Sequence, residues 1–132
     1  MIPSFIRWWG PLLAYMCLIF YFSSASRPTL LRYAPDYAWH FAAYFGMGVL
    51  SVRAFAQGLA LPASMRATLY GLAFSMAYAF SDEWHQSFVP HRTASLGDLA
   101  ADFLGIMGAV AVLSIYWRFV GWTDSTAERS RS

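Results

Sequence analysis

The sequence predicts an all-α fold: an integral membrane bundle of four transmembrane helices with both termini on the same side of the bilayer. Hydrophobic residues make up 58% of the 132 residues, and charged residues make up only 12%. Soluble domains carry roughly 25% charged residues, so the composition favours a membrane protein. The apolar residues also fall in four long blocks, and a spanning helix needs about 20 mostly apolar residues.

The four expected helices cover residues 6–24, 36–56, 63–86 and 96–118. Prolines in the intervening segments mark the loops; they are Pro28, Pro35, Pro62 and Pro90. Arg7 before an apolar run also fits a signal peptide, but the bulky aromatic residues favour an uncleaved helix that contributes mainly hydrophobic packing. We expect one domain over residues 1–122 and a polar, disordered cytoplasmic tail over 123–132.

Arginine is distributed unevenly between the two sides of this bundle. All nine basic residues are Arg, and six of them fall on the side of the termini against three on the other side. The positive-inside rule then places both termini in the cytoplasm. The net charge of +2 is too small to indicate a nucleic-acid partner.

Acidic and histidine side chains gather on the opposite, outer side. Only Asp124 and Glu128 fall inside in this topology. Membrane insertion does not require this segregation, because the orientation rule counts Arg and Lys. The outer set therefore marks a candidate functional face; it consists of Asp36, Asp82, Glu83, Asp98, Asp102, His40, His85 and His91.

In the second helix, Asp36, His40 and Tyr44 recur at every fourth residue, which puts them on one helical face. Asp36 follows a proline and could simply cap the helix, and His40 with Tyr44 could be an interfacial polar stripe. An ionisable residue inside a span is nevertheless a functional candidate by default. We take His40 as a candidate catalytic residue, and Asp36 and Tyr44 as candidate substrate-binding residues.

The third helix ends in a polar run in which Glu83 and Gln86 share one face, while Asp82 and His85 share another. A helix C-terminus disfavours carboxylates; a solvated loop could tolerate these two acids, and a function is the alternative explanation. Glu83 is a candidate catalytic residue and Gln86 a candidate substrate-binding residue. An acid-x-x-His pair can contribute to a metal site, so Asp82 and His85 could bind a divalent ion, although a second such pair is missing.

The fourth helix begins with Ser95 and Asp98, which match the Ser-x-x-acid pattern of a helix start. Capping is therefore the alternative to a catalytic role for Asp98. Asp102 lies one turn deeper, and a mid-membrane carboxylate costs about 3 kcal/mol, so we expect a partner, either Arg92 or His40. Small residues at every fourth position predict close approach to a neighbouring helix; they are Gly97, Ala101, Gly105 and Ala109.

Together, these motifs resemble the VanZ-like family of bacterial membrane proteins over about residues 8–118. The resemblance rests on residues 20–24, on Asp36-x-x-x-His40-x-x-x-Tyr44, on the run 82–92, and on Ser95, Asp98 and 101–105. The chain departs from the family pattern at three positions: Tyr37 stands where Lys is common, His91 where Gly is common, and Asp102 where Asn is common. The last difference adds a carboxylate to the candidate site.

The family takes its name from an accessory factor in glycopeptide resistance of the teicoplanin type. The resemblance implies a multi-pass protein of the bacterial inner membrane that serves the cell envelope, and the arginine distribution places the candidate site on the outer side. The acid, His and Arg side chains gathered there predict a membrane lipid or a lipid-linked cell-wall precursor as the partner.

Three hypotheses for the function follow. In the first, the protein is a hydrolase or transferase acting on a lipid-linked phosphate or glycan. Arg92 would then hold the anionic headgroup, and Glu83 or His40 would transfer protons. Asp98 and Asp102 would orient that group or bind a divalent ion. In the second hypothesis the same residues bind an envelope lipid or cell-wall precursor without chemistry, and in the third they form a structural polar network.

Overall fold

The structure, a computed structural model, describes residues 3–25 and 35–129, with side chains as far as residue 120. This part of the chain folds into four helices without a strand: α1 (Ser4–Ser24), α2 (Asp36–Ala56), α3 (Met65–Gln86) and α4 (Leu96–Arg129). The all-α prediction is confirmed, and the predicted bounds of the first three helices agree closely with the observed ones. The loop predicted around Pro28, with Arg27 and Arg32, lies outside the described residues.

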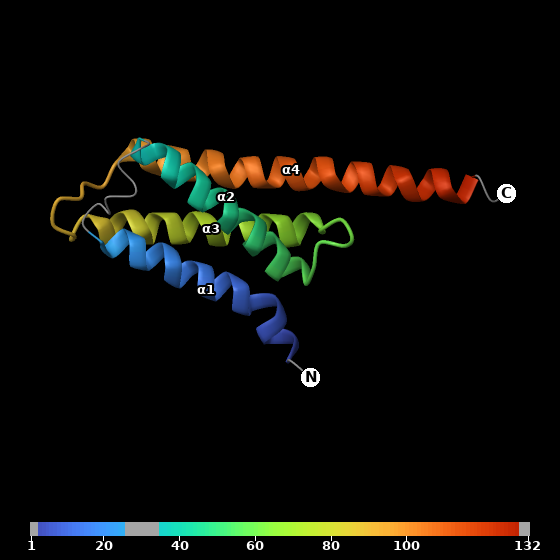
Figure 1. Ribbon diagram of the computed structural model, residues 1–132, viewed down its shortest axis with the longest axis horizontal. Coiled ribbons are helices and arrows are strands. Elements are labelled where there is room, and N and C mark those ends of the chain that lie inside the picture. The colour runs from blue at the N-terminus through green and yellow to red at the C-terminus, as the bar shows by residue number, and fades with distance from the viewer. Residues whose placement is uncertain (1–2, 26–34, 130–132) are drawn as a thin grey trace.

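Helix α4 extends further than the sequence predicts. It continues to Arg129 and so enters the segment 123–132 that was expected to be a tail, and it projects beyond the other helices (Figure 1). The division into a domain of residues 1–122 and a separate tail stays a prediction.

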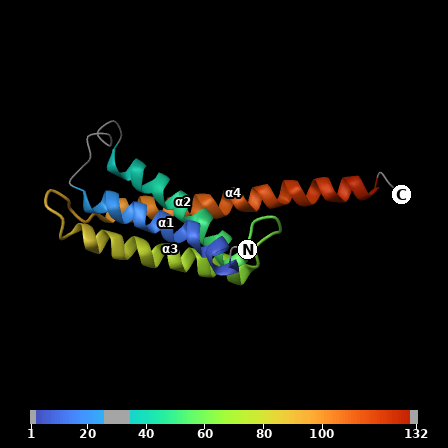
Figure 2. The ribbon, with the colours of Figure 1, turned by 60° about the horizontal axis from the view of Figure 1, so that its bottom comes forward.

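Successive helices run in opposite directions. The ends of α1 and α3 therefore gather with the starts of α2 and α4 at one end of the bundle (Figure 1). We call this the loop end, and it comprises residues 22–25, 36–40 and 82–102. A second view shows the same gathering, with the N- and C-terminal ends of the chain directed the opposite way (Figure 2). Most of the polar residues singled out in the sequence are thus brought to one end by topology alone.

Helices α2 and α4 pack most closely, at the stripe of small residues predicted in the fourth helix. A Cβ atom added to Gly105 would meet the carbonyl oxygen of Phe41 and would lie 2.9 Å from the backbone nitrogen of Phe45. One added to Gly48 would lie 2.9 Å from the Cβ of Ala109. Only glycine allows this approach at both positions, so the small-residue stripe sets the distance between the two helices.

Large apolar side chains cover the outside of the bundle. Leu69, Phe80 and Ile115 are each more than half exposed, and an apolar surface of this extent is typical of lipid or protein contact. By length and composition, α1 and the Leu96–Val120 part of α4 are apolar enough to cross a membrane. Among the described helices α2 and α3 do not reach that level, so a bundle in which all four helices cross stays a prediction.

Candidate functional site

Three helices contribute to a buried polar cluster at the loop end. His40 comes from α2, Glu83 from α3 and Asp102 from α4. The Nδ1 atom of His40 lies 3.0 Å from Oδ1 of Asp102 and 3.7 Å from Oε1 of Glu83. All three residues are buried, and Asp102 is fully so. Of the two partners expected for Asp102, the structure therefore selects His40 over Arg92.

The contact with Asp102 determines how the His40 ring can act. A carboxylate accepts a hydrogen bond but cannot donate one when ionised, so Nδ1–H of His40 donates to Oδ1 of Asp102. Nε2 is left as the ring nitrogen that can exchange a proton or accept a hydrogen bond. Asp102 thus positions the ring, and Nε2 is the ring nitrogen of His40 that remains for other contacts.

Glu83 also ties the α3–α4 loop to the cluster. Its Oε2 accepts a hydrogen bond of 2.9 Å from the backbone N–H of Ser95. Ser95 caps α4 as predicted, because its hydroxyl oxygen accepts hydrogen bonds from the N–H groups of Gly97 and Asp98. In a capping box the third helical residue returns a bond to the cap N–H. Here Glu83 of another helix makes that bond, which leaves the Asp98 carboxylate for other contacts.

The role of Glu83 in this loop can be tested with two substitutions. Glu83→Gln keeps an oxygen that can accept from Ser95 N–H, whereas Glu83→Ala removes it. We expect the alanine variant to be less stable than the glutamine variant by about 1–3 kcal/mol, the cost of an unpaired buried group. Thermal unfolding in detergent measures the difference. Equal stability of the two variants would show that the bond does not hold the loop.

Asp98 lies next to His40 and Glu83, and these three residues could hold a metal ion. One ligand atom from each lies within 4.8 Å of the others. One imidazole and two carboxylates form a ligand set suited to Zn²⁺ or Mn²⁺, and such ligands bind Zn²⁺ at about 2.0–2.2 Å.

The pair that the sequence indicated for a metal, Asp82 and His85, has other contacts. Asp82 accepts a hydrogen bond from Gln86. The His85 ring stacks on Phe20 with centroids 4.6 Å apart, and its Nε2 lies 3.0 Å from the Ser24 hydroxyl. Among the described residues, these two do not combine with a third ligand.

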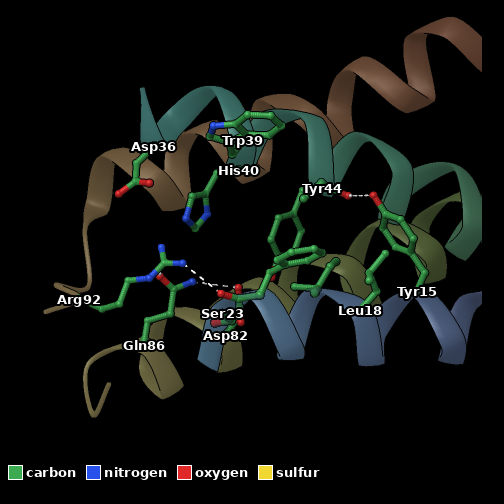
Figure 3. Close-up of a pocket in the computed structure, with 13 residues that line it drawn as sticks. Tyr15, Leu18, Ser23, Asp36, Trp39, His40, Tyr44, Asp82, Gln86 and Arg92 are labelled. Carbon is green, nitrogen blue, oxygen red and sulfur yellow. Dashed lines mark hydrogen bonds between the residues drawn. The ribbon is translucent and has the colours of Figure 1, made fainter. Parts of the chain in front are cut away.

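A cavity of about 140 Å³ opens beside the cluster. A cavity of about 150 Å³ can hold a molecule the size of benzene, so there is room for a small headgroup. His40 points from α2 toward Arg92 and Gln86 across this space (Figure 3). The walls of the cavity contain six of the sequence-derived candidates; they are Asp36, His40, Tyr44, Asp82, Gln86 and Arg92. Glu83, Asp98 and Asp102 are not part of the lining. They lie next to His40, outside the cavity wall.

Arg92 anchors the end of α1 as well as lining the cavity. Its Nη2 donates to the carbonyl oxygen of Phe22 at 3.1 Å, its Nε to that of Ala25 at 3.5 Å, and its Nη1 to Oε1 of Gln86 at 3.5 Å. These acceptors are neutral, and no carboxylate in the described part of the chain pairs with the guanidinium. The positive charge of Arg92 is therefore held in place without being neutralised.

Helix α1 contributes more to the site than the hydrophobic packing expected of it. Tyr15 and Ser23 line the cavity, and the carbonyl groups at the end of α1 hold Arg92. Trp39 is a further lining residue that the sequence analysis did not single out. One sequence signal could have indicated this contribution of α1. Residues 20–24, which carry part of the family resemblance, include Ser23.

The comparisons with known proteins identify one family. Its model, described as VanZ/LLP1, matches residues 8–118, which is most of the chain. No curated protein and no solved structure matches the chain.

Proposed function

This chain belongs to the VanZ/LLP1 family, and from that premise we propose that it acts on a lipid-linked, phosphate-bearing molecule of the bacterial cell envelope. In this proposal all four helices cross the inner membrane, both termini are cytoplasmic, and the loop end faces the outer leaflet. One observation carries the proposal: the same cavity presents His40, whose ring is positioned by Asp102, and the guanidinium of Arg92, which has no ion-pair partner among the described residues.

Arg92 is suited to bind the anion. A guanidinium has five N–H donors, and three of its donor contacts go to neutral oxygen atoms. Two N–H donors remain, and paired donors on one planar cation match the oxygen atoms of a phosphate. Because its other contacts fix the side chain, Arg92 can bind an anion without first losing much conformational freedom.

His40 is suited to transfer a proton next to that anion. Its Nδ1–H is engaged by Asp102, so Nε2 would take a proton from a nucleophile or return one to a leaving group. The reaction class is hydrolysis or group transfer at a phosphate or glycan linkage. Glu83 and Asp98 lie next to the imidazole but outside the cavity lining. Their carboxylates would stabilise the protonated ring without contacting the bound molecule.

Two substitutions and a control test this function. The protein in nanodiscs is supplied with undecaprenyl phosphate and diphosphate, and binding and product formation are measured separately. Arg92→Gln should weaken binding, whereas His40→Gln should leave binding intact and lower turnover by about 10²–10⁴-fold, the usual contribution of acid–base catalysis. Arg66→Gln, which removes an exposed guanidinium at the start of α3, should change neither. Full turnover in His40→Gln would refute the catalytic role.

A non-catalytic binder is the second candidate. The observation that favours it is the position of Glu83, Asp98 and Asp102 outside the lining, because binding needs Arg92 and the cavity alone. Such a protein would sequester an envelope lipid or a cell-wall precursor and so support glycopeptide resistance of the teicoplanin type. In the same experiment a binder forms no product under any condition. Its lipid binding is weakened by Arg92→Gln and is unchanged by His40→Gln.

A further inference from the structure

Asp82 has no role in the function proposed above, yet it is a buried carboxylate on the cavity wall. Its side chain comes from α3 and is 5% exposed. Oδ2 accepts a hydrogen bond of 3.1 Å from Nε2 of Gln86, and Oδ1 is buried without a hydrogen-bond partner. No basic side chain in the described part of the chain forms an ion pair with it. A buried carboxylate with a single neutral partner is costly unless a cation approaches it.

Two more buried hydroxyl groups lie on the same wall. Tyr44 is 1% exposed and Ser23 is 4% exposed, and neither hydroxyl makes a hydrogen bond of full geometry to the described residues. The Tyr44 hydroxyl also lies near the Asp82 carboxylate. Both residues line the cavity with Asp82. A protonated primary amine has one positive charge and three N–H donors. Its charge matches the carboxylate of Asp82, and its three donors match in number the buried oxygen atoms that Asp82, Tyr44 and Ser23 offer on this wall.

Gln86 lies between the carboxylate of Asp82 and the guanidinium of Arg92 and bonds to both. Its amide oxygen accepts from Nη1 of Arg92, and its amide nitrogen donates to Asp82. The close-up shows Gln86 next to Arg92 on the cavity wall, with Asp82 beyond it (Figure 3). The Arg92 guanidinium and the Asp82 carboxylate therefore face the same small space with the Gln86 amide between them, and Asp36 contributes a second carboxylate to the lining. Arg92 and Asp82 are held apart and do not form an ion pair with each other.

We propose that the cavity binds a headgroup carrying a protonated primary amine next to its phosphate, as in the phosphoethanolamine class. The phosphate contacts Arg92, and the amine contacts Asp82, Tyr44 and Ser23. This rests on the proposed function for the phosphate end alone. The same chemistry is offered by a membrane phospholipid and by free phosphoethanolamine in solution.

Binding of short-chain lipids to the full-length protein tests the amine. Isothermal titration in detergent compares dihexanoyl phosphatidylethanolamine with the choline and glycerol lipids of the same chain length. Choline keeps the positive charge but has no N–H donor, and glycerol has no positive charge. Because hydrogen bonds to charged groups are strong, we expect the ethanolamine lipid to bind about tenfold or more tightly than either. Free phosphoethanolamine, titrated alone, shows whether the acyl chains are needed.

Variants separate the two ends of the site. Asp82→Asn should bring the ethanolamine lipid to the affinity of the glycerol lipid and leave the latter unchanged. Tyr44→Phe should remove part of the preference, and Arg92→Gln should weaken all three lipids. Ser81→Ala, at an exposed neighbour of Asp82, is the control and should keep the wild-type order.

Each outcome decides one of the two proposals. Equal binding of the three lipids by the wild-type protein overturns the amine site, even if Asp82→Asn fails to fold. So does a preference for ethanolamine that survives in Asp82→Asn. If Arg92→Gln still weakens binding in those cases, the phosphate proposal stands by itself. If no lipid binds in an Arg92-dependent way, the phosphate proposal fails. A preference for the ethanolamine lipid that is lost in Asp82→Asn would in that case support the amine contact alone.

Discussion

Gly105→Ala is expected to destabilise the protein by roughly 1–3 kcal/mol, the range for overpacking a well-packed core. The added methyl group would meet the carbonyl oxygen of Phe41 and the backbone nitrogen of Phe45. These are backbone atoms of α2, so no side chain can rotate away, and the two helices must separate. Separation would also stretch the contact between His40 and Asp102, because they sit on these two helices. We therefore expect Gly105→Ala to have a lower unfolding temperature in detergent and a weaker affinity for lipid.

Gly108→Ala is the matched control on the same helix. The nearest atoms to its added methyl group belong to the rings of Phe45 and Phe41, at 3.5 Å and 3.7 Å, which is ordinary contact. Alanine is favoured over glycine in a helix by about 0.5–1 kcal/mol, so this variant should be as stable as the wild type or more so. Gly105→Ala and Gly108→Ala are thus expected to shift the unfolding temperature in opposite directions. A stabilised Gly105→Ala would contradict the close approach of α2 and α4.

Asp102→Leu is expected to cost about 3–5 kcal/mol, because removing one partner of a buried pair leaves the other unpaired. Asp102 is fully buried and its Oδ1 holds Nδ1–H of His40. Asp102→Asn retains an acceptor for that N–H and should lose less stability. The unfolding free energy of the two variants measures the difference, and a leucine variant as stable as the wild type would contradict it.

The double variant His40→Leu and Asp102→Leu separates a structural from a functional role of the pair. It leaves neither polar partner alone, so it should recover much of the stability lost in Asp102→Leu. If the pair is functional, the recovered protein should still lack turnover. If the pair only fixes the bundle, as in the structural reading of the polar network, every variant that restores stability should also restore activity.

The helices could be predicted well because their signals are local. The bounds 36–56 expected for the second helix are those of α2, since an apolar block between loop prolines specifies a helix without reference to the rest of the chain. The cap by Ser95 was predicted for the same reason, because its hydroxyl contacts N–H groups two and three residues away. Helices α2 and α3 fall below the hydropathy of a spanning helix because they carry more polar residues, so a membrane crossing by these two helices stays a prediction.

The site could be predicted only as a set of residues. The sequence selected His40, Glu83, Arg92 and Asp102, and short loops between antiparallel helices bring their segments to one end. It left two partners open for Asp102, and it missed the bond from Ser95 to Glu83, which joins residues of different elements. It also assigned α1 to packing, although the carbonyl groups at the end of α1 hold Arg92.

By itself, the sequence determined the helices and the gathering of polar residues at one end, because composition and periodicity are properties of each helix alone, and its motifs carried the family resemblance. Only the tertiary structure decided which polar residues line the cavity and which form the buried cluster beside it. It placed His40 between the buried acids and a cavity, and it set Asp82 and Arg92 on that cavity with Gln86 between them. The physical reason is that burial and pairing depend on the approach of separate helices, here limited by Gly105 and Gly48, and spacing along one chain does not specify that approach.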